Sequence, residues 1–197
     1  MFVQVITGQV NDTQGLSAAM ERWRLDVRPG AIGFLGSTVG ITDDSRFVAL
    51  ARFDSPDAAR ANSDRSEQAS WWTQAEGCFS GPVTFHDCSE VDLYRDGGTD
   101  TAGFVQVMQG HADRARLREL DDRFEDRLAA LRPDLLGSVR AWDGDEYIEA
   151  AYFSTEAAAR AAESQDIPPD VAAELGDWQQ AMGEVTYYDL TSPQLTS

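Results

Sequence analysis

The tetrapeptide Phe-Val-Gln-Val stands at residues 2–5 and again at residues 104–107, and the sequence that follows it is also written twice. Four further segments recur in the same order and at nearly constant spacing: Arg-Pro at 28–29 and 132–133, Ala-Ala-Arg-Ala at 58–61 and 158–161, WTQAEG at 72–77 with WQQAMG at 178–183, and VTFHD at 83–87 with VTYYD at 185–189. Five matches in register do not arise by chance, so the chain consists of two copies of one structural unit.

The repeat sets the domain boundaries. We predict a first repeat at residues 1–88, a linker at 89–103, a second repeat at 104–190 and a C-terminal tail at 191–197. The linker is rich in Gly, Asp and Thr and lacks hydrophobic periodicity, as is typical of connecting segments.

Each copy predicts the element order βαββαβ. Short segments rich in valine and aromatic residues begin the copies, at 2–7 and 104–109, and predict strands. Apolar residues at helical spacing follow, from Leu16 to Val27 in the first copy, and an Arg-Pro pair ends this helix. A strand hairpin, a second helical region that begins near residues 55–57 and a final strand complete the unit. This order is the ferredoxin-like split βαβ arrangement, an α+β fold.

Both faces of the first strand are apolar, because Phe2 and Ile6 point one way while Val3 and Val5 point the other. Two helices can cover only one face of a four-stranded sheet, so the second face must also be buried. We therefore predict that the two repeats pack sheet to sheet as a pseudo-dimeric α+β barrel. The chain would then be a monomer with an intramolecular barrel, or a weak homodimer.

The charge of the chain excludes several partners. Its 197 residues contain 16 Lys and Arg against 34 Asp and Glu, for a net charge of −18, which disfavours nucleic acid and anionic membrane surfaces. No apolar run is long enough to span a bilayer, and no signal-like segment opens the sequence, so we expect a cytoplasmic protein. Two cysteines are too few for a disulfide framework or a zinc site.

The segment RPGAIGF at 28–34, followed by RFV at 46–48 and FDSPDAA at 53–59, resembles the dimeric α+β barrel superfamily, and within it the antibiotic biosynthesis monooxygenase (ABM) family. The second copy keeps the pattern more loosely. Family members are usually single domains that pair into a barrel, so the resemblance implies a barrel built from one chain. It also implies a small hydrophobic, aromatic ligand and oxygenation of quinol-type or anthrone-type substrates without a metal or bound organic cofactor.

The resemblance does not extend to the haem-degrading members. Those proteins use an Asn on the first strand together with a Trp and a His on the second helix. The first strands of this chain contain no Asn, and its second helical regions contain no His. The residues leave open a non-catalytic ligand-binding or interaction module of the same fold.

Gln4 and Gln106 are single amides within otherwise apolar strands, at equivalent positions of the two copies. A buried amide is costly unless it is hydrogen-bonded. Each one either donates a hydrogen bond to a bound ligand, as a substrate-binding residue, or bonds to neighbouring backbone or to its counterpart across the barrel.

Trp71, Trp72 and His86 complete the candidate site. Tryptophans of this kind most often fill a core, but Trp71 and Trp72 could also line a substrate pocket. His86 lies on the last strand of the first copy, where the second copy has Tyr188, and an imidazole there could act as the general base on a phenol or anthrone. The alternative is a surface or hydrogen-bonded histidine. The two histidines are too far apart in the sequence for a metal site.

The two copies differ most at polar and unpaired aromatic positions, so we expect one of them at most to hold a functional site, and we favour the first. The second copy also carries Gln-Asp-Ile-Pro-Pro-Asp at 165–170. Two prolines cannot continue a helix interior, so we predict that its second helical region breaks there.

Overall fold

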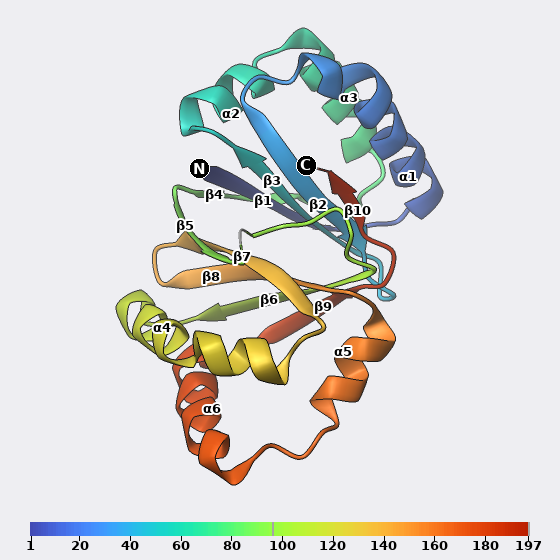
Figure 1. The fold of residues 1–197 in the computed structure, drawn as a ribbon. Helices are drawn as coiled ribbons and strands as arrows, with labels where there is room; N and C mark the ends of the chain where they lie inside the picture. The colour runs from blue at the N-terminus through green and yellow to red at the C-terminus, as the bar shows by residue number, and fades with distance from the viewer. Residues whose placement is uncertain (96, 197) are drawn as a thin grey trace. The chain divides into compact units, whose positions relative to one another are not determined.

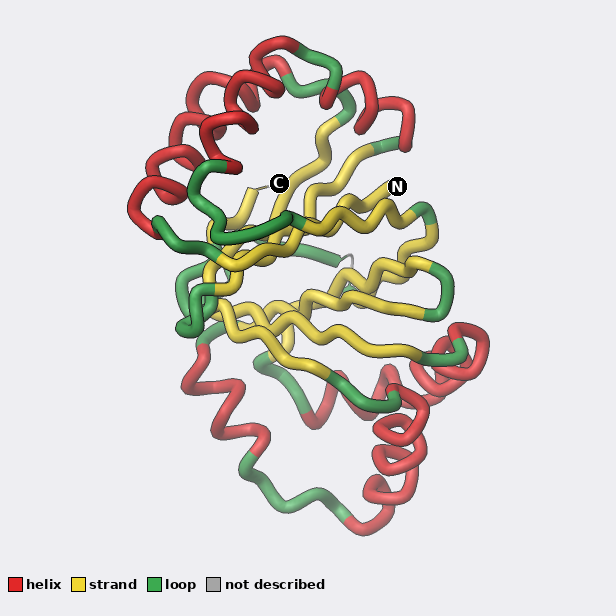
Figure 2. The backbone as a smooth tube through the Cα atoms, turned by 180° about the vertical axis from the view of Figure 1, so that it is seen from behind, coloured by secondary structure: helices red, strands yellow, loops and turns green. Residues whose placement is uncertain are grey.

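The computed structural model describes residues 1–95 and 97–196 and divides into two compact units. The first unit contains Met1–Val91 and the chain end from Ser192, and the second contains Asp92–Thr191 (Figure 1). Each unit has one five-stranded antiparallel sheet with helices on one face, as Figure 2 shows by secondary structure. The prediction of two α+β repeats with the order βαββαβ is confirmed.

The first unit is built around the sheet order β10-β2-β3-β1-β4. Its elements are β1 (Phe2–Gln9), α1 (Thr13–Arg22), the π-helical turn η1 (Trp23–Val27), the 3₁₀ turn η2 (Arg28–Gly30), β2 (Phe34–Ile41), β3 (Arg46–Phe53), α2 (Pro56–Ser63), α3 (Ser66–Glu76), β4 (Thr84–Cys88) and β10 (Gln194–Thr196).

The second unit repeats this plan with the sheet order β5-β7-β8-β6-β9. Its elements are β5 (Glu90–Tyr94), β6 (Phe104–His111), α4 (Arg114–Leu131), β7 (Leu135–Asp143), β8 (Glu146–Phe153), α5 (Glu156–Glu163), α6 (Pro169–Met182) and β9 (Thr186–Leu190).

Local sequence signals explain where the helices begin. Asp12 caps α1 by accepting a hydrogen bond from the backbone N–H of Gly15, and Asp113 caps α4 in the same way. Ser55 and Thr155 cap α2 and α5 with their hydroxyls. The repeated caps place the helices at the same positions relative to both sheets.

Two edge strands were not predicted. β5 lies within the segment assigned to the linker and pairs beside β7, while β10 lies in the C-terminal tail and pairs beside β2. Each sheet is therefore completed by a strand that follows the other repeat in the sequence. Both strands are short: β10 has three residues, and the alternation of β5 spans only residues 90–93 before the Gly- and Thr-rich part of the linker, so neither was recognised from the sequence pattern.

The second helical region breaks in both repeats. The predicted break in the second copy is confirmed, because α5 ends at Glu163 and α6 begins at Pro169. The first copy also breaks, between α2 and α3, where Arg65 adopts an extended conformation. Its guanidinium donates to the backbone carbonyl of Val27 at 3.2 Å, which stabilises this interruption without a proline.

None of the helices in the described part of the chain is both long enough and apolar enough to cross a membrane.

Candidate functional site

Gln4 and Gln106 are held by carboxylates on the neighbouring edge strands. The side-chain amide of Gln4 donates to Asp87 at 2.8 Å, and that of Gln106 donates to Asp189 at 2.9 Å. In each case the two residues face one another directly in the strand register. The acceptor is therefore a side chain of the next strand, neither backbone nor the other glutamine, and this cross-strand pair is common to both repeats.

The structure does not bring Gln4 and His86 together. His86 is opposite Val5 in the register, whereas Gln4 is opposite Asp87. Since side chains alternate between the faces of a sheet, Gln4 lies on the helix-covered face with Phe2, and His86 lies on the other face. The two side chains cannot contact one ligand beneath the helices.

Trp71 and Trp72 connect α3 to α1 and to the sheet. The indole N–H of Trp71 donates to the backbone carbonyl of Ala19 on α1 at 2.7 Å. The ring of Trp72 packs edge-on against Phe85 of β4, with centroids 5.3 Å apart, and against Trp71 at 5.8 Å. These contacts are those of partly buried packing residues that join helix to helix and helix to sheet.

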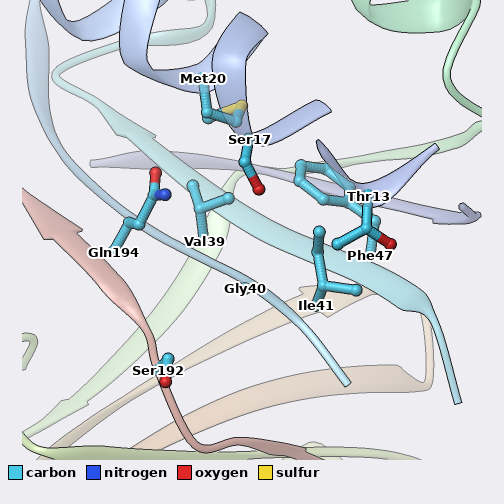
Figure 3. A pocket seen from close by; sticks show the side chains of 9 residues that line it. All are labelled: Thr13, Ser17, Met20, Val39, Gly40, Ile41, Phe47, Ser192 and Gln194. Atoms are coloured by element: carbon cyan, nitrogen blue, oxygen red, sulfur yellow. The ribbon is translucent and has the colours of Figure 1, made fainter. Parts of the chain in front are cut away.

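A pocket of about 260 Å³ lies in the first unit, between α1 and the β2–β10 edge of the sheet. We call it the α1 pocket. Figure 3 shows Ser17 and Met20 of α1 pointing toward the sheet and Val39 and Gln194 pointing toward the helix. Its lining residues are Thr13, Ser17, Met20, Val39, Gly40, Ile41, Phe47, Ser192 and Gln194.

A second pocket, of about 320 Å³, adjoins the α1 pocket along the same helix. Met20, Val39 and Gln194 line both pockets, so the two form neighbouring parts of one groove. Trp23 and Arg24 of η1 also line the second pocket. The π-helical turn has no counterpart in the continuous helix α4, and such turns are frequent at functional sites.

The chemical character of the α1 pocket follows from its lining. All of its lining side chains are uncharged: Met20, Val39, Ile41 and Phe47 supply apolar surface, and the other side chains supply hydroxyls and one amide. Such a pocket suits a ligand that is mostly apolar and carries one or two neutral hydrogen-bonding oxygens. The lining contains no side chain of a type that titrates near neutral pH, so none of its side chains can act as a general base at that pH.

None of the residues predicted for the site lines the α1 pocket. Gln4 shares its face of the sheet but is tied to Asp87, and the two tryptophans pack at the far side of α1. The pocket could not be found from one copy of the repeat, because Ser192 and Gln194 come from the end of the chain. A position-by-position comparison of the copies would have shown the signal, since Val39 stands where the second repeat has Arg140.

Comparisons with known proteins support the fold. No protein-family model matches the sequence, and no curated protein matches it. Among solved structures, a Lactobacillus acidophilus protein provisionally named a monooxygenase is 11% identical, with a TM-score of 0.71 over 100% of this chain and 99% of its own. A Fusobacterium nucleatum protein with the same provisional name is 9% identical, with a TM-score of 0.76 over 100% and 94%. A protein described as anthrone oxidase-like is 12% identical, with a TM-score of 0.65 over 98% and 92%.

These full-length likenesses define the class of fold: a tandem α+β protein of the kind found in monooxygenase-like structures. The chain has the same tandem α+β fold as these structures. The resemblance seen in the sequence is confirmed at the level of the fold.

Proposed function

We propose that this chain binds a small, uncharged, hydrophobic and aromatic ligand in the α1 pocket and oxygenates it without a metal or organic cofactor. The observation that carries the binding proposal is the pocket itself, whose uncharged lining lies between a helix and a sheet. The fold shared with proteins named as monooxygenases supports the reaction class.

The reaction that fits this proposal is the oxidation of an activated methylene next to aromatic rings, as in anthrone. One O₂ is consumed: one oxygen atom forms the new C=O bond, and the other leaves as water with the two hydrogens of the methylene. The balance needs no external reductant. The protein would contribute orientation of the substrate, while hydroxyls such as that of Ser17 hold its oxygen.

The experiment has a binding arm and a turnover arm. Fluorescence titration with 9-anthracenemethanol, an uncharged three-ring probe, measures binding, and oxygen uptake with anthrone measures turnover against the rate in buffer. Ser17→Trp places an indole at the pocket and is expected to weaken probe binding roughly tenfold or more. Ala18→Trp changes the next residue of the same helix, which is exposed and does not line the pocket, and is expected to bind like the wild type.

A second candidate function is non-catalytic binding of the same ligand class. The uncharged lining favours it, because no lining side chain can act as a general base. Probe binding that is sensitive to Ser17→Trp, without anthrone oxidation above the rate in buffer, would select this candidate. Equal affinity of both tryptophan variants and the wild type would refute the α1 pocket as the site.

A further inference from the structure

The strand registers allow the two repeats to be compared position by position. In the first unit Phe53 of β3 pairs with Phe34 of β2, and in the second unit Phe153 of β8 pairs with Leu135 of β7. In both units the register of the pair shifts at the glycine that follows. From there Val39 faces Ala49 in the first unit, and Arg140 faces Glu149 in the second.

The helices can be aligned in the same way from their caps. Met20 occupies the same position after the cap Asp12 as Asp121 does after the cap Asp113. Ser17 corresponds by the same count to Arg118. The lining residues on α1, β2 and β3 therefore have defined counterparts in the second repeat.

The counterpart positions of the second repeat are filled by large and charged side chains. Arg140 is 4% exposed; its Nε donates to Glu149 at 2.7 Å and its Nη1 lies 2.5 Å from Asp121. Asp121 also accepts a hydrogen bond from the indole of Trp178 at 2.8 Å. These contacts tie α4 and α6 to the sheet.

A second group of contacts in the second repeat lies next to its edge strand, β5. Trp142 stands where the first repeat has Ile41; it is 2% exposed, and its indole donates to Asp92 of β5 at 2.7 Å. Arg118 forms an ion pair with the same carboxylate at 2.6 Å. In the first repeat the corresponding strand, β10, contributes Gln194 to the pocket lining.

We infer that the chain binds one ligand, in the first repeat, and that Met20, Val39 and Ile41 determine what the α1 pocket accepts. Their counterparts Asp121, Arg140 and Trp142 fill the equivalent space of the second repeat. This inference rests on the proposed function. It adds the stoichiometry and the residues that set ligand size.

The first test uses matched substitutions at one aligned position. Ser17→Trp and Arg118→Trp place the same side chain on α1 and on α4. Titration of the wild type with 9-anthracenemethanol is expected to give one probe per chain. Ser17→Trp should weaken this binding about tenfold or more, and Arg118→Trp should leave the affinity within about twofold of the wild type.

The second test exchanges the residues between repeats. Asp121→Met, Arg140→Val, Trp142→Ile and Glu149→Ala together give the second repeat the side chains of the first, and this variant should bind two probes per chain. Circular dichroism and the retained binding at the first repeat show whether it folds. If it does not fold, the single-position pair above still decides the question.

The outcomes separate this inference from the proposed function. No probe binding by the wild type refutes the proposed function and this inference with it. Two probes per wild-type chain refutes the inference alone. One probe lost in Arg118→Trp and kept in Ser17→Trp refutes the α1 pocket as the site, and this inference with it. One probe per chain, lost only in Ser17→Trp, supports both.

Discussion

Replacing Arg140 by valine removes the central cation of the buried network in the second repeat. The side chain of Arg140 is 5% exposed and that of Glu149 is 7% exposed, so the substitution leaves a buried carboxylate without its guanidinium. Burial lowers the pKa of Arg140, but the charges of Glu149 and Asp121 outweigh that effect and raise its pKa above the ordinary value. The guanidinium is therefore charged at every pH at which the protein is folded.

The expected loss of stability in Arg140→Val depends on which of the charged partners of Arg140 remain unpaired. Breaking a buried ion pair by removing one member costs about 3–5 kcal/mol, because the remaining charge is desolvated and unpaired. Asp121 is one-third exposed and keeps its bond from Trp178, so Glu149 accounts for most of this loss. We expect Arg140→Val to lower the free energy of unfolding of the second repeat by about 3–5 kcal/mol.

The double variant Arg140→Val with Glu149→Ala supplies the control. It reproduces the Val39 and Ala49 pair that the first repeat uses at the same register position. Exchanging both members of a buried ion pair for apolar residues is often neutral, although the smaller side chains leave some cavity. The double variant should recover at least half of the loss.

Hydrogen exchange of the β7 and β8 amides under increasing urea measures this free energy for the second repeat specifically. A change below about 1 kcal/mol in Arg140→Val would refute the reasoning, since it falls well short of the cost of a stranded buried charge. A double variant no more stable than the single one would also refute it.

Three further predictions concern individual contacts. Asp87→Ala removes the acceptor of the Gln4 amide and should cost about 0.5–1.5 kcal/mol in urea unfolding. Asp189→Ala removes the acceptor of the Gln106 amide together with the ion pair of Arg160 and should cost at least as much, and an unchanged midpoint in both variants would contradict the cross-strand pair. Burial raises the pKa of Tyr147, whose hydroxyl donates to Met182 at 3.2 Å; because the folded state retains this proton, stability should fall as the pH rises above the ordinary phenol value of 10.0. Tyr147→Phe should remove that part of the alkaline pH dependence, and an identical pH profile would refute it. His86→Ala should leave probe binding to the α1 pocket unchanged, because His86 lies on the face of the sheet opposite to Gln4 and the helices, and a large loss of affinity would place the site elsewhere.

The sequence predicted the fold because the features that determine it are local and repeated. Three local features occur in both copies: the FVQV segment, the capped helix start and the Arg-Pro helix end. Each feature acts over a few residues, and its presence in one copy supports the structure predicted for the other. The sequence also contained the Gln4 and Asp87 pairing in principle, because both residues recur in both copies. Their contact needs the strand register, which the spacing of the segments alone does not supply.

The α1 pocket could not be predicted from the sequence, for a different physical reason. Its lining combines α1, β2 and β3 with Ser192 and Gln194, which come from the opposite end of the chain. The strand that carries Gln194 has only three residues, and its backbone pairing with β2 holds it in the sheet. Three residues of mixed polarity show no periodicity from which a strand can be predicted.

The two repeats show that the fold itself does not require the buried charges of the second unit. The same register position holds Val39 opposite Ala49 in one sheet and Arg140 opposite Glu149 in the other, and the neighbouring position holds Phe47 in one and Tyr147 in the other. Since the apolar pair supports an equivalent sheet, the ion pairs of the second repeat are not needed to form it. Their distinctive effect is to fill the space beneath α4 with hydrogen-bonded side chains, whereas the first repeat keeps uncharged side chains around an open volume of about 260 Å³. A duplicated scaffold can thus vary the side chains at one position without changing its backbone, and the copy in which that position stays open is the one for which we propose ligand binding.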